Sequence, residues 1–206
     1  KITEANTLAD ILEIRLDMMD TFDLRAIIQA SHRPILATYR SKKEGGKGSE
    51  DPETRTDHAI TAIQDGADLV DVELSLPPKW RERIFHEKGR SDIVISTHRD
   101  NGTPSRPDLE KILIDSAATG ADFVKIVTRA ETWADNLRVL ELIPKAQDRG
   151  IKITAFCMGP IGRISRIFSH LMGAHLTFTS LEVGQESASG QIPVREMKKI
   201  MEMLSP

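Results

Sequence analysis

The amino-acid sequence predicts a (β/α)8 barrel, an α/β fold in which parallel strands alternate with helices. Seven apolar segments alternate with helical segments, in units about as long as one βα repeat. Such strict alternation indicates parallel strands joined by right-handed crossovers. One face of these strands is aliphatic and the other is repeatedly polar. A doubly wound sheet would instead be apolar on both faces, because helices cover both of them.

The composition sets the limits of this prediction. The chain has 206 residues, of which 39% are hydrophobic and 29% charged, and its net charge is −3. These values suit one globular domain over residues 1–206 and argue against a large basic surface for nucleic acid. The single cysteine, Cys157, fits a reducing cytoplasm. No apolar run is long enough to span a membrane, no signal peptide opens the chain, and no Cys/His cluster has the spacing of a zinc site.

The individual elements follow from apolar periodicity and from turn residues. A first helix is expected to end near Asp10. Strands are predicted over 12–17, 35–39, 68–74, 92–97, 120–129, 151–158 and 175–181. Helices are predicted over about 23–30, 52–64, 131–149, 161–172 and 193–203. Two more are expected: one that begins at Pro77–Pro78, and another, before the strand at 120–129, that ends near 119. A closed barrel needs eight strands, so the first is expected to be short or to lie upstream of Lys1.

A polar, glycine-rich segment follows the strand at 35–39. Its glycines, Gly45, Gly46 and Gly48, raise the possibility of a phosphate-binding loop. The segment lacks the GxxxxGK[ST] pattern that such loops require, so the sequence favours a mobile loop.

Lys125 stands in the middle of the predicted strand GADFVKIVTR. Strand alternation places it on one face with Phe123 and Val127. Burial among apolar residues disfavours the charged ammonium and leaves the free amine, which is a nucleophile for carbonyl carbons. The alternative is a structural lysine that reaches solvent or ends in an ion pair.

Further polar residues are expected, with Lys125, at the rim formed by the carboxyl ends of the barrel strands, where barrel active sites lie. Arg163 and Arg166 stand in the first turn of a helix, where a cation opposes the helix dipole and suits an anionic ligand or a distant carboxylate. Jointly these residue types suit an anionic, hydroxylated carbonyl substrate attacked by an amine, with a histidine moving protons. Taken singly, they also allow an interior ion-pair network and a hydrogen-bonded core histidine. The residues expected at this rim are Glu13, Arg15, Arg40, His98, Lys125 and Met158. Asp17, Asp71 and Glu73 lie on the polar strand faces, and for Asp71 and Glu73 the sequence favours the ion-pair network.

Seven short motifs then identify a family. The chain closely resembles type I 3-dehydroquinate dehydratase, the Schiff-base enzyme of the shikimate pathway, from about residue 11 to its C-terminus. The family is a (β/α)8 barrel, often dimeric, that needs no metal or organic cofactor. The motifs that carry the resemblance, in order, are EIRLD, TYRSKKEGG, DVEL, STHRD, VKIV, MGPIGRISR and SASGQI.

The resemblance implies a role for each motif. Lys125 would form an imine with the C3 ketone of 3-dehydroquinate, and His98 would move the protons with Glu44 as its carboxylate partner. The product would be 3-dehydroshikimate, formed by syn elimination in aromatic amino-acid biosynthesis. Substrate contacts would come from Glu13, Arg15 and Arg40 (ring hydroxyls), Arg166 (carboxylate), Met158 (beside the imine), and Ser187 and Gln191 (a lid loop).

Some positions depart from the family pattern. Arg99 follows the histidine where the family usually has Asp, and Ser189 replaces a proline in the predicted lid, which we expect to loosen it. Two other functions fit the residues: an aldolase-like Schiff-base barrel for another keto acid, and a non-catalytic sensor of a shikimate-type ligand. The presence of both Lys125 and His98 favours the dehydratase.

Overall fold

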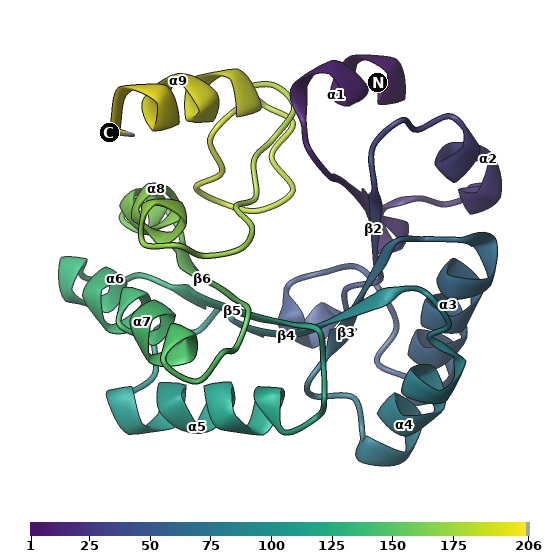
Figure 1. Ribbon diagram of the computed structural model, residues 1–206, viewed down its shortest axis with the longest axis horizontal. Coiled ribbons are helices and arrows are strands. Elements are labelled where there is room, and N and C mark those ends of the chain that lie inside the picture. The colour runs from purple at the N-terminus through teal and green to yellow at the C-terminus, as the bar shows by residue number, and fades with distance from the viewer. Residues whose placement is uncertain (205–206) are drawn as a thin grey trace. The chain divides into compact units, whose positions relative to one another are not determined.

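The computed structural model describes residues 1–204 and contains two compact units, one from Lys1 to Ser96 and one from Thr97 onwards. Figure 1 labels their helices and strands. The last two residues of the predicted domain, 205 and 206, lie outside the described residues. No helix among the described residues is both long and apolar enough to cross a membrane.

In the first unit, neighbouring strands follow one another in chain order and pair in parallel. The register sets Arg15 beside Thr38, and Thr38 beside Asp71. Polar side chains of three neighbouring strands therefore meet near the carboxyl ends of those strands. The elements are α1 (Ile2–Leu8), β1 (Leu12–Arg15), η1 (Leu16–Met18), α2 (Leu24–Gln29), β2 (Ile35–Thr38), η2 (Lys42–Glu44), α3 (Pro52–Asp65), β3 (Leu69–Glu73), α4 (Pro78–Glu87) and β4 (Asp92–Arg99), which enters the second unit after Ser96.

Helices α3 and α4 pack against each other beside β3 (Figure 1). Helix α3 begins where the Asp51 side chain accepts a hydrogen bond from the backbone N–H of Thr54, and Pro52 occupies the first turn. It ends at Gly66, whose φ of 98° suits a residue without a Cβ. This capping fixes the helix that carries Arg55.

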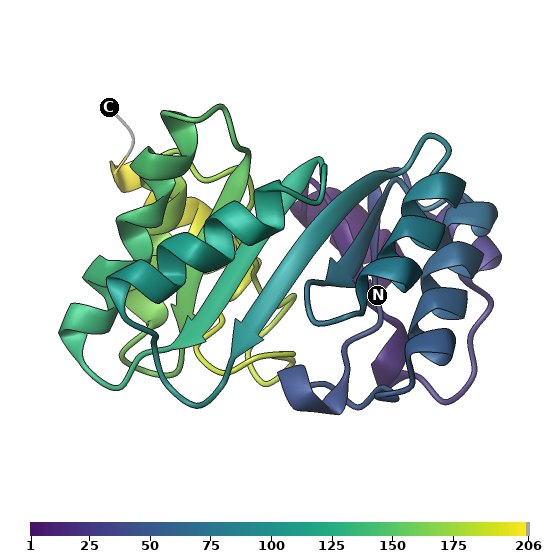
Figure 2. The same cartoon turned by 90° about the horizontal axis from the view of Figure 1, so that it is seen from below.

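The second unit contains the parallel pair β5–β6, with Lys125 beside Thr154. The two strand faces separate as alternation predicts. Val124, Ile126 and Ile153 belong to the core formed with the helices, whereas Val127 and Met158 belong to a second apolar cluster. Figure 2 shows α5 lying along one face of this pair. The elements are α5 (Arg106–Ala117), β5 (Phe123–Arg129), α6 (Trp133–Leu140), α7 (Leu142–Gln147), β6 (Ile153–Met158), α8 (Arg163–Leu171) and α9 (Val194–Leu204).

The predicted strand over 175–181 is wrong. This segment is irregular apart from one bridge, between Ser180 and Pro193. Next to β6, the Thr154 hydroxyl accepts a hydrogen bond from the backbone N–H of Leu176 and donates one to its carbonyl. A side chain thus takes the backbone groups that a strand would offer to its neighbour. Residues 1–204 contain six strands, not the seven that the apolar segments predicted.

Three other boundaries differ from the predictions. The helix expected over 131–149 is two helices, α6 and α7, which meet at Glu141. Pro144 lacks the N–H that a continuous helix would direct to the Leu140 carbonyl, so the hydrogen-bond ladder breaks there. Strand β1 stops at Arg15, where a 3-10 turn begins, and β4 continues to Arg99, two residues beyond the predicted end.

Candidate active site

Arg40 stands just after β2 and is the most heavily paired cation of the first unit among the described residues. Its guanidinium lies 2.8 Å from Asp71, 3.0 Å from Glu73 and 3.6 Å from Glu44. Burial alone would lower the pKa of Arg40, but these three carboxylates raise it above its ordinary value. Arg40 is therefore a fixed positive charge at every pH at which the protein folds.

Glu44 lies in the turn η2, inside the glycine-rich loop. One carboxylate oxygen, Oε1, accepts a hydrogen bond from the Ser75 hydroxyl at 2.9 Å, and the other lies near Arg40. The carboxylate is buried and held from two sides, so its direction is set before any substrate arrives.

Asp17 anchors both ends of the loop over residues 40–48. Its carboxylate accepts hydrogen bonds from the backbone N–H groups of Arg40 (3.2 Å) and Lys47 (3.0 Å), and a bidentate pair joins it to Arg15. Burial raises the pKa of Asp17, but these donors outweigh it and the pKa is lowered. The sequence favoured a mobile loop here; the structure instead ties the loop to Asp17, a side chain of the 3-10 turn η1 that follows β1.

Glu13 completes the predicted cluster of the first unit. Its carboxylate accepts a hydrogen bond of 2.9 Å from the Thr38 hydroxyl on the neighbouring strand. Glu13, Arg15 and Arg40 thus lie in or just after the neighbouring strands β1 and β2, as predicted, and Glu44 lies in the loop that follows β2. Asp71 and Glu73 are part of the same ion-pair network, the role that the sequence allowed for them.

Lys125 lies in β5 and is 5% exposed. Its ammonium lies 3.9 Å from the centroid of the Phe178 ring, a cation–π contact. The Phe178 ring in turn lies 6.1 Å from that of Phe156, and the Arg166 guanidinium stands 4.4 Å from the Phe156 ring. Two aromatic rings therefore connect the predicted nucleophile with the predicted carboxylate ligand.

Arg166 is 1% exposed, although it belongs to the first turn of α8. Its Nη2 donates to the Ser189 carbonyl at 3.2 Å, and its own carbonyl accepts from the Thr177 hydroxyl. Met158, at the end of β6, packs in the apolar cluster with Phe156, Phe178 and Ala188. Met158 and Arg166 thus lie around the same aromatic pair.

The predicted lid, residues 187–191, is a compact turn. The backbone N–H of Ser187 donates to the Gln191 side chain at 2.8 Å, and the Gln191 amide donates back to the Ser187 hydroxyl. Gly190 has φ of 84°, and a Cβ there would lie 2.5 Å from the Gly159 carbonyl oxygen. The turn therefore rests directly on the backbone that follows β6.

His98 lies one residue before the end of β4 and is partly buried. It belongs to the second unit, whereas Glu44 belongs to the first. The pairing of these two residues stays a prediction. Among residues 1–204, no group of three or more His, Cys, Asp and Glu side chains is arranged to hold a metal ion.

Two aromatic residues of the site were not predicted. Phe178 lies in the segment expected as a strand, but its direction follows from the irregular path of that segment. Phe156 alternates with Cys157 in β6, and alternation alone does not say which of them faces Lys125. The one sequence signal for these contacts was an aromatic residue, Phe156, in the strand that follows the Lys125 strand.

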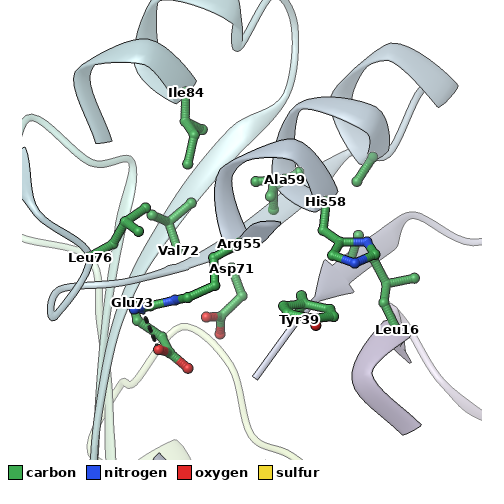
Figure 3. A pocket seen from close by; sticks show the side chains of 13 residues that line it. Leu16, Tyr39, Arg55, His58, Ala59, Asp71, Val72, Glu73, Leu76 and Ile84 are labelled. Carbon is green, nitrogen blue, oxygen red and sulfur yellow. Dashed lines mark hydrogen bonds and ion pairs between the residues drawn. The ribbon is translucent and has the colours of Figure 1, made fainter. Parts of the chain in front are cut away.

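A pocket in the first unit lies elsewhere. Figure 3 shows it between β3 and the helices α3 and α4, with His58 stacked on Tyr39 at 4.0 Å between ring centroids. Burial lowers the pKa of His58. None of the residues predicted to touch substrate lines this pocket, although Asp71 and Glu73 of the ion-pair network do.

Comparison with known proteins gives a consistent result. A model of the family "Type I 3-dehydroquinase" matches residues 1–206. The chain is 37% identical over 204 residues to the 3-dehydroquinate dehydratase of Thermococcus gammatolerans, covering 99% of this chain and 91% of that protein. It is 38% identical over 194 residues to the bifunctional chloroplastic 3-dehydroquinate dehydratase/shikimate dehydrogenase of Arabidopsis thaliana, covering 92% of this chain but 32% of that protein.

Solved structures agree with these relatives. The 3-dehydroquinate dehydratase of Geobacillus kaustophilus matches with a TM-score of 0.89 at 26% identity, covering 98% of this chain and 84% of that one. The type I enzyme of Clostridium difficile, solved with covalently modified comenic acid, matches with a TM-score of 0.87 at 27% identity, covering 98% and 86%. The predicted α/β class, of the TIM-barrel kind, is confirmed.

Proposed function

The chain belongs to the type I 3-dehydroquinase family, and we propose that Lys125 is the amine on which its reaction runs. The activity is the dehydration of 3-dehydroquinate, a hydro-lyase step of the shikimate pathway. The observation that supports Lys125 is its burial in β5 against the Phe178 ring. An aldolase-like enzyme would use the same amine, but the family match favours the dehydratase, and a sensor would not need this amine.

The chemistry explains why an amine is needed. A proton beside a simple ketone is weakly acidic. Lys125 condenses with the C3 ketone, water leaves, and the protonated imine becomes an electron sink for the C2 carbanion. His98 removes the C2 proton, the resulting enamine expels the C1 hydroxyl with a proton from His98, and water then releases the product from the lysine. The product is 3-dehydroshikimate, formed by syn elimination.

The remaining groups bind and orient. We propose that Arg166 holds the substrate carboxylate through its planar guanidinium, and that Glu13, Arg15 and Arg40 hold the ring hydroxyls. Met158 would pack beside the imine. Glu44 would orient His98 and support its charged form. The turn with Ser187 and Gln191 would close over the bound substrate. We propose that residues 1–206 act as a single catalytic domain.

Borohydride trapping tests the role of Lys125. Reduction in the presence of 3-dehydroquinate is expected to add the mass of one bound ligand, and peptide mapping should place it at Lys125. Lys125→Ala should abolish both the adduct and the turnover followed by the ultraviolet absorbance of the conjugated product. Lys152→Ala, which removes an exposed lysine stacked on Phe123, is the control and should keep both. Full turnover in Lys125→Ala would contradict the proposal.

His98 is tested by the step at which its variant stops. His98→Ala should still form the imine but stall before proton removal, so the trapped adduct should accumulate without product. An absence of adduct in this variant would argue against His98 as the base. His86→Ala, in α4, is the matched control and should turn over normally.

We also propose a homodimer in the cytoplasm. Trp133 (67% exposed) and Leu137 (62%) stand one turn apart on α6, and Phe168 on the neighbouring α8 is also exposed. Ile164 on α8 and Met172, just after α8, are also exposed. Exposed apolar side chains on two packed helices suit a protein contact. We name these five residues the α6–α8 patch and propose a second copy of the chain as its partner.

A further inference from the structure

We propose that Glu73 is a positioning residue for the reaction: with Arg55 it fixes the place of Arg40 and of the loop that carries Glu44. The inference rests on the proposed roles of Arg40 and Glu44. It gives a function to a carboxylate that touches neither the reacting amine nor the lid.

Glu73 accepts hydrogen bonds at both of its carboxylate oxygens. Its Oε1 accepts from Arg40 Nη1 at 3.0 Å and from the backbone N–H of Ser41 at 2.9 Å. Its Oε2 accepts from Arg55 Nη2 at 2.5 Å (Figure 3). Glu73 is 3% exposed, and a carboxylate buried this deeply is tolerated only when charged donors surround it.

Arg55 links the network to the helix layer. It projects from α3, and its Nη2 contacts both Glu73 and the Ser75 hydroxyl, the latter at 3.1 Å. The Ser75 hydroxyl donates in turn to Glu44 Oε1 at 2.9 Å. A single guanidinium held by a capped helix therefore reaches the predicted partner of His98 through one intervening hydroxyl.

The hydrogen bond from the Ser41 backbone N–H to Glu73 fixes the position of the loop over residues 40–48. The Ser41 carbonyl accepts from the backbone N–H groups of Glu44 (3.2 Å) and Gly46 (2.8 Å). A Cβ at Gly46 would lie 2.1 Å from the Arg40 carbonyl oxygen, so the loop closes tightly on its own start. A shift of Ser41 therefore moves Glu44, and Glu73 is the side chain that holds the Ser41 N–H.

Arg55 also determines how Arg40 is shared. With Arg55 in place, each Glu73 oxygen faces a different guanidinium. Without Arg55, the carboxylates of Glu73, Asp71 and Glu44 would have Arg40 as their shared cation. We expect the Arg40 guanidinium then to shift away from the position in which it would contact substrate. A merely structural ion pair would lower stability and leave each folded site unchanged. A positioning pair changes the kinetics of every folded site.

The test compares Glu73→Gln with Asp57→Asn, which removes an exposed ion pair to Arg83 and lies on α3, the helix that carries Arg55. Competent sites are counted by borohydride trapping at Lys125, and kcat and KM are measured per trapped site across pH. Glu73→Gln is expected to raise KM about tenfold or more, since it removes the negative charge between Arg40 and Arg55 and turns an amide NH₂ donor toward one of these guanidiniums, and to alter the pH profile of kcat. Asp57→Asn should match the parent protein.

The outcomes separate the two proposals. Per-site kcat, KM and pH profile equal to those of the parent in Glu73→Gln would overturn the positioning role while Lys125 trapping still upheld the function. No trapping in the parent protein would overturn the function itself. If Glu73→Gln does not fold, Arg55→Lys and Arg55→Met decide: a smaller KM increase in the lysine variant supports the role, and parental KM in both overturns it.

Discussion

The ammonium of Lys125 lies 3.9 Å from the centroid of the Phe178 ring. The face of an aromatic ring attracts a cation, and the protonated imine carries positive charge at this nitrogen, whereas the amine that attacks the ketone is neutral. The ring therefore favours the charged intermediate that the dehydration needs.

Phe178→Leu should slow the reaction. Loss of a buried cation–π contact of about 1–2 kcal/mol corresponds to roughly a fivefold to thirtyfold lower kcat. The measurement is the rate of product formation and of borohydride trapping. Phe123→Leu is the matched control, because Phe123 stacks on the exposed Lys152. Equal rates in Phe178→Leu and the parent protein would show that the ring has no part in catalysis.

Asp17 should make stability depend on pH in the acid range. Its pKa is lowered in the folded protein, so its stabilisation is complete above the unfolded value of about 3.9 and is lost as the pH falls through the folded pKa. Asp17→Asn should reduce the free energy of unfolding by about 2 kcal/mol at pH 7. In denaturant titrations this difference should shrink toward acid pH. The exposed Asp20→Asn should change little at either pH.

Gly190→Ala should loosen the predicted lid. Gly190 and Gly184 have nearly equal φ values, 84° and 81°, so alanine strains the backbone equally at both. Only at Gly190 would the new Cβ meet backbone, at the Gly159 carbonyl. Limited proteolysis with ligand bound should therefore cut residues 183–190 faster in Gly190→Ala than in Gly184→Ala, and KM should rise. Equal protection in both variants would contradict contact with Gly159 as the anchor of the lid.

Leu137→Asp should weaken the proposed dimer. The substitution places a charge within the α6–α8 patch, and sedimentation should show a higher monomer fraction at equal concentration. Ile114→Asp changes a residue that is 52% exposed on α5, outside the patch, and should leave the distribution unchanged. A parent protein that is already monomeric at micromolar concentration would refute the dimer.

Local patterns in the sequence were sufficient for much of this protein. Period-two alternation placed Lys125 and the rim carboxylates on the faces where they lie, because successive strand residues point to opposite sides. The seven motifs, read together, identified the family that the comparisons confirm. The sequence also placed three candidate residues correctly: Arg40 and Met158 lie near the ends of strands, and Arg166 lies in the first turn of a helix.

The tertiary structure decided which groups meet. Arg55 lies on helix α3 and Glu73 on strand β3, eighteen positions apart in the sequence, and no local pattern indicates that they share a hydrogen bond. The same holds for Phe178. Its segment was predicted to be a strand, but there the Thr154 hydroxyl accepts a hydrogen bond from the backbone N–H of Leu176, and the segment is irregular. Local propensity fixes the direction of a side chain only within a regular element. Long-range hydrogen bonds and packing fix the rest, and at this site they bind the glycine-rich loop to Asp17 and Glu73.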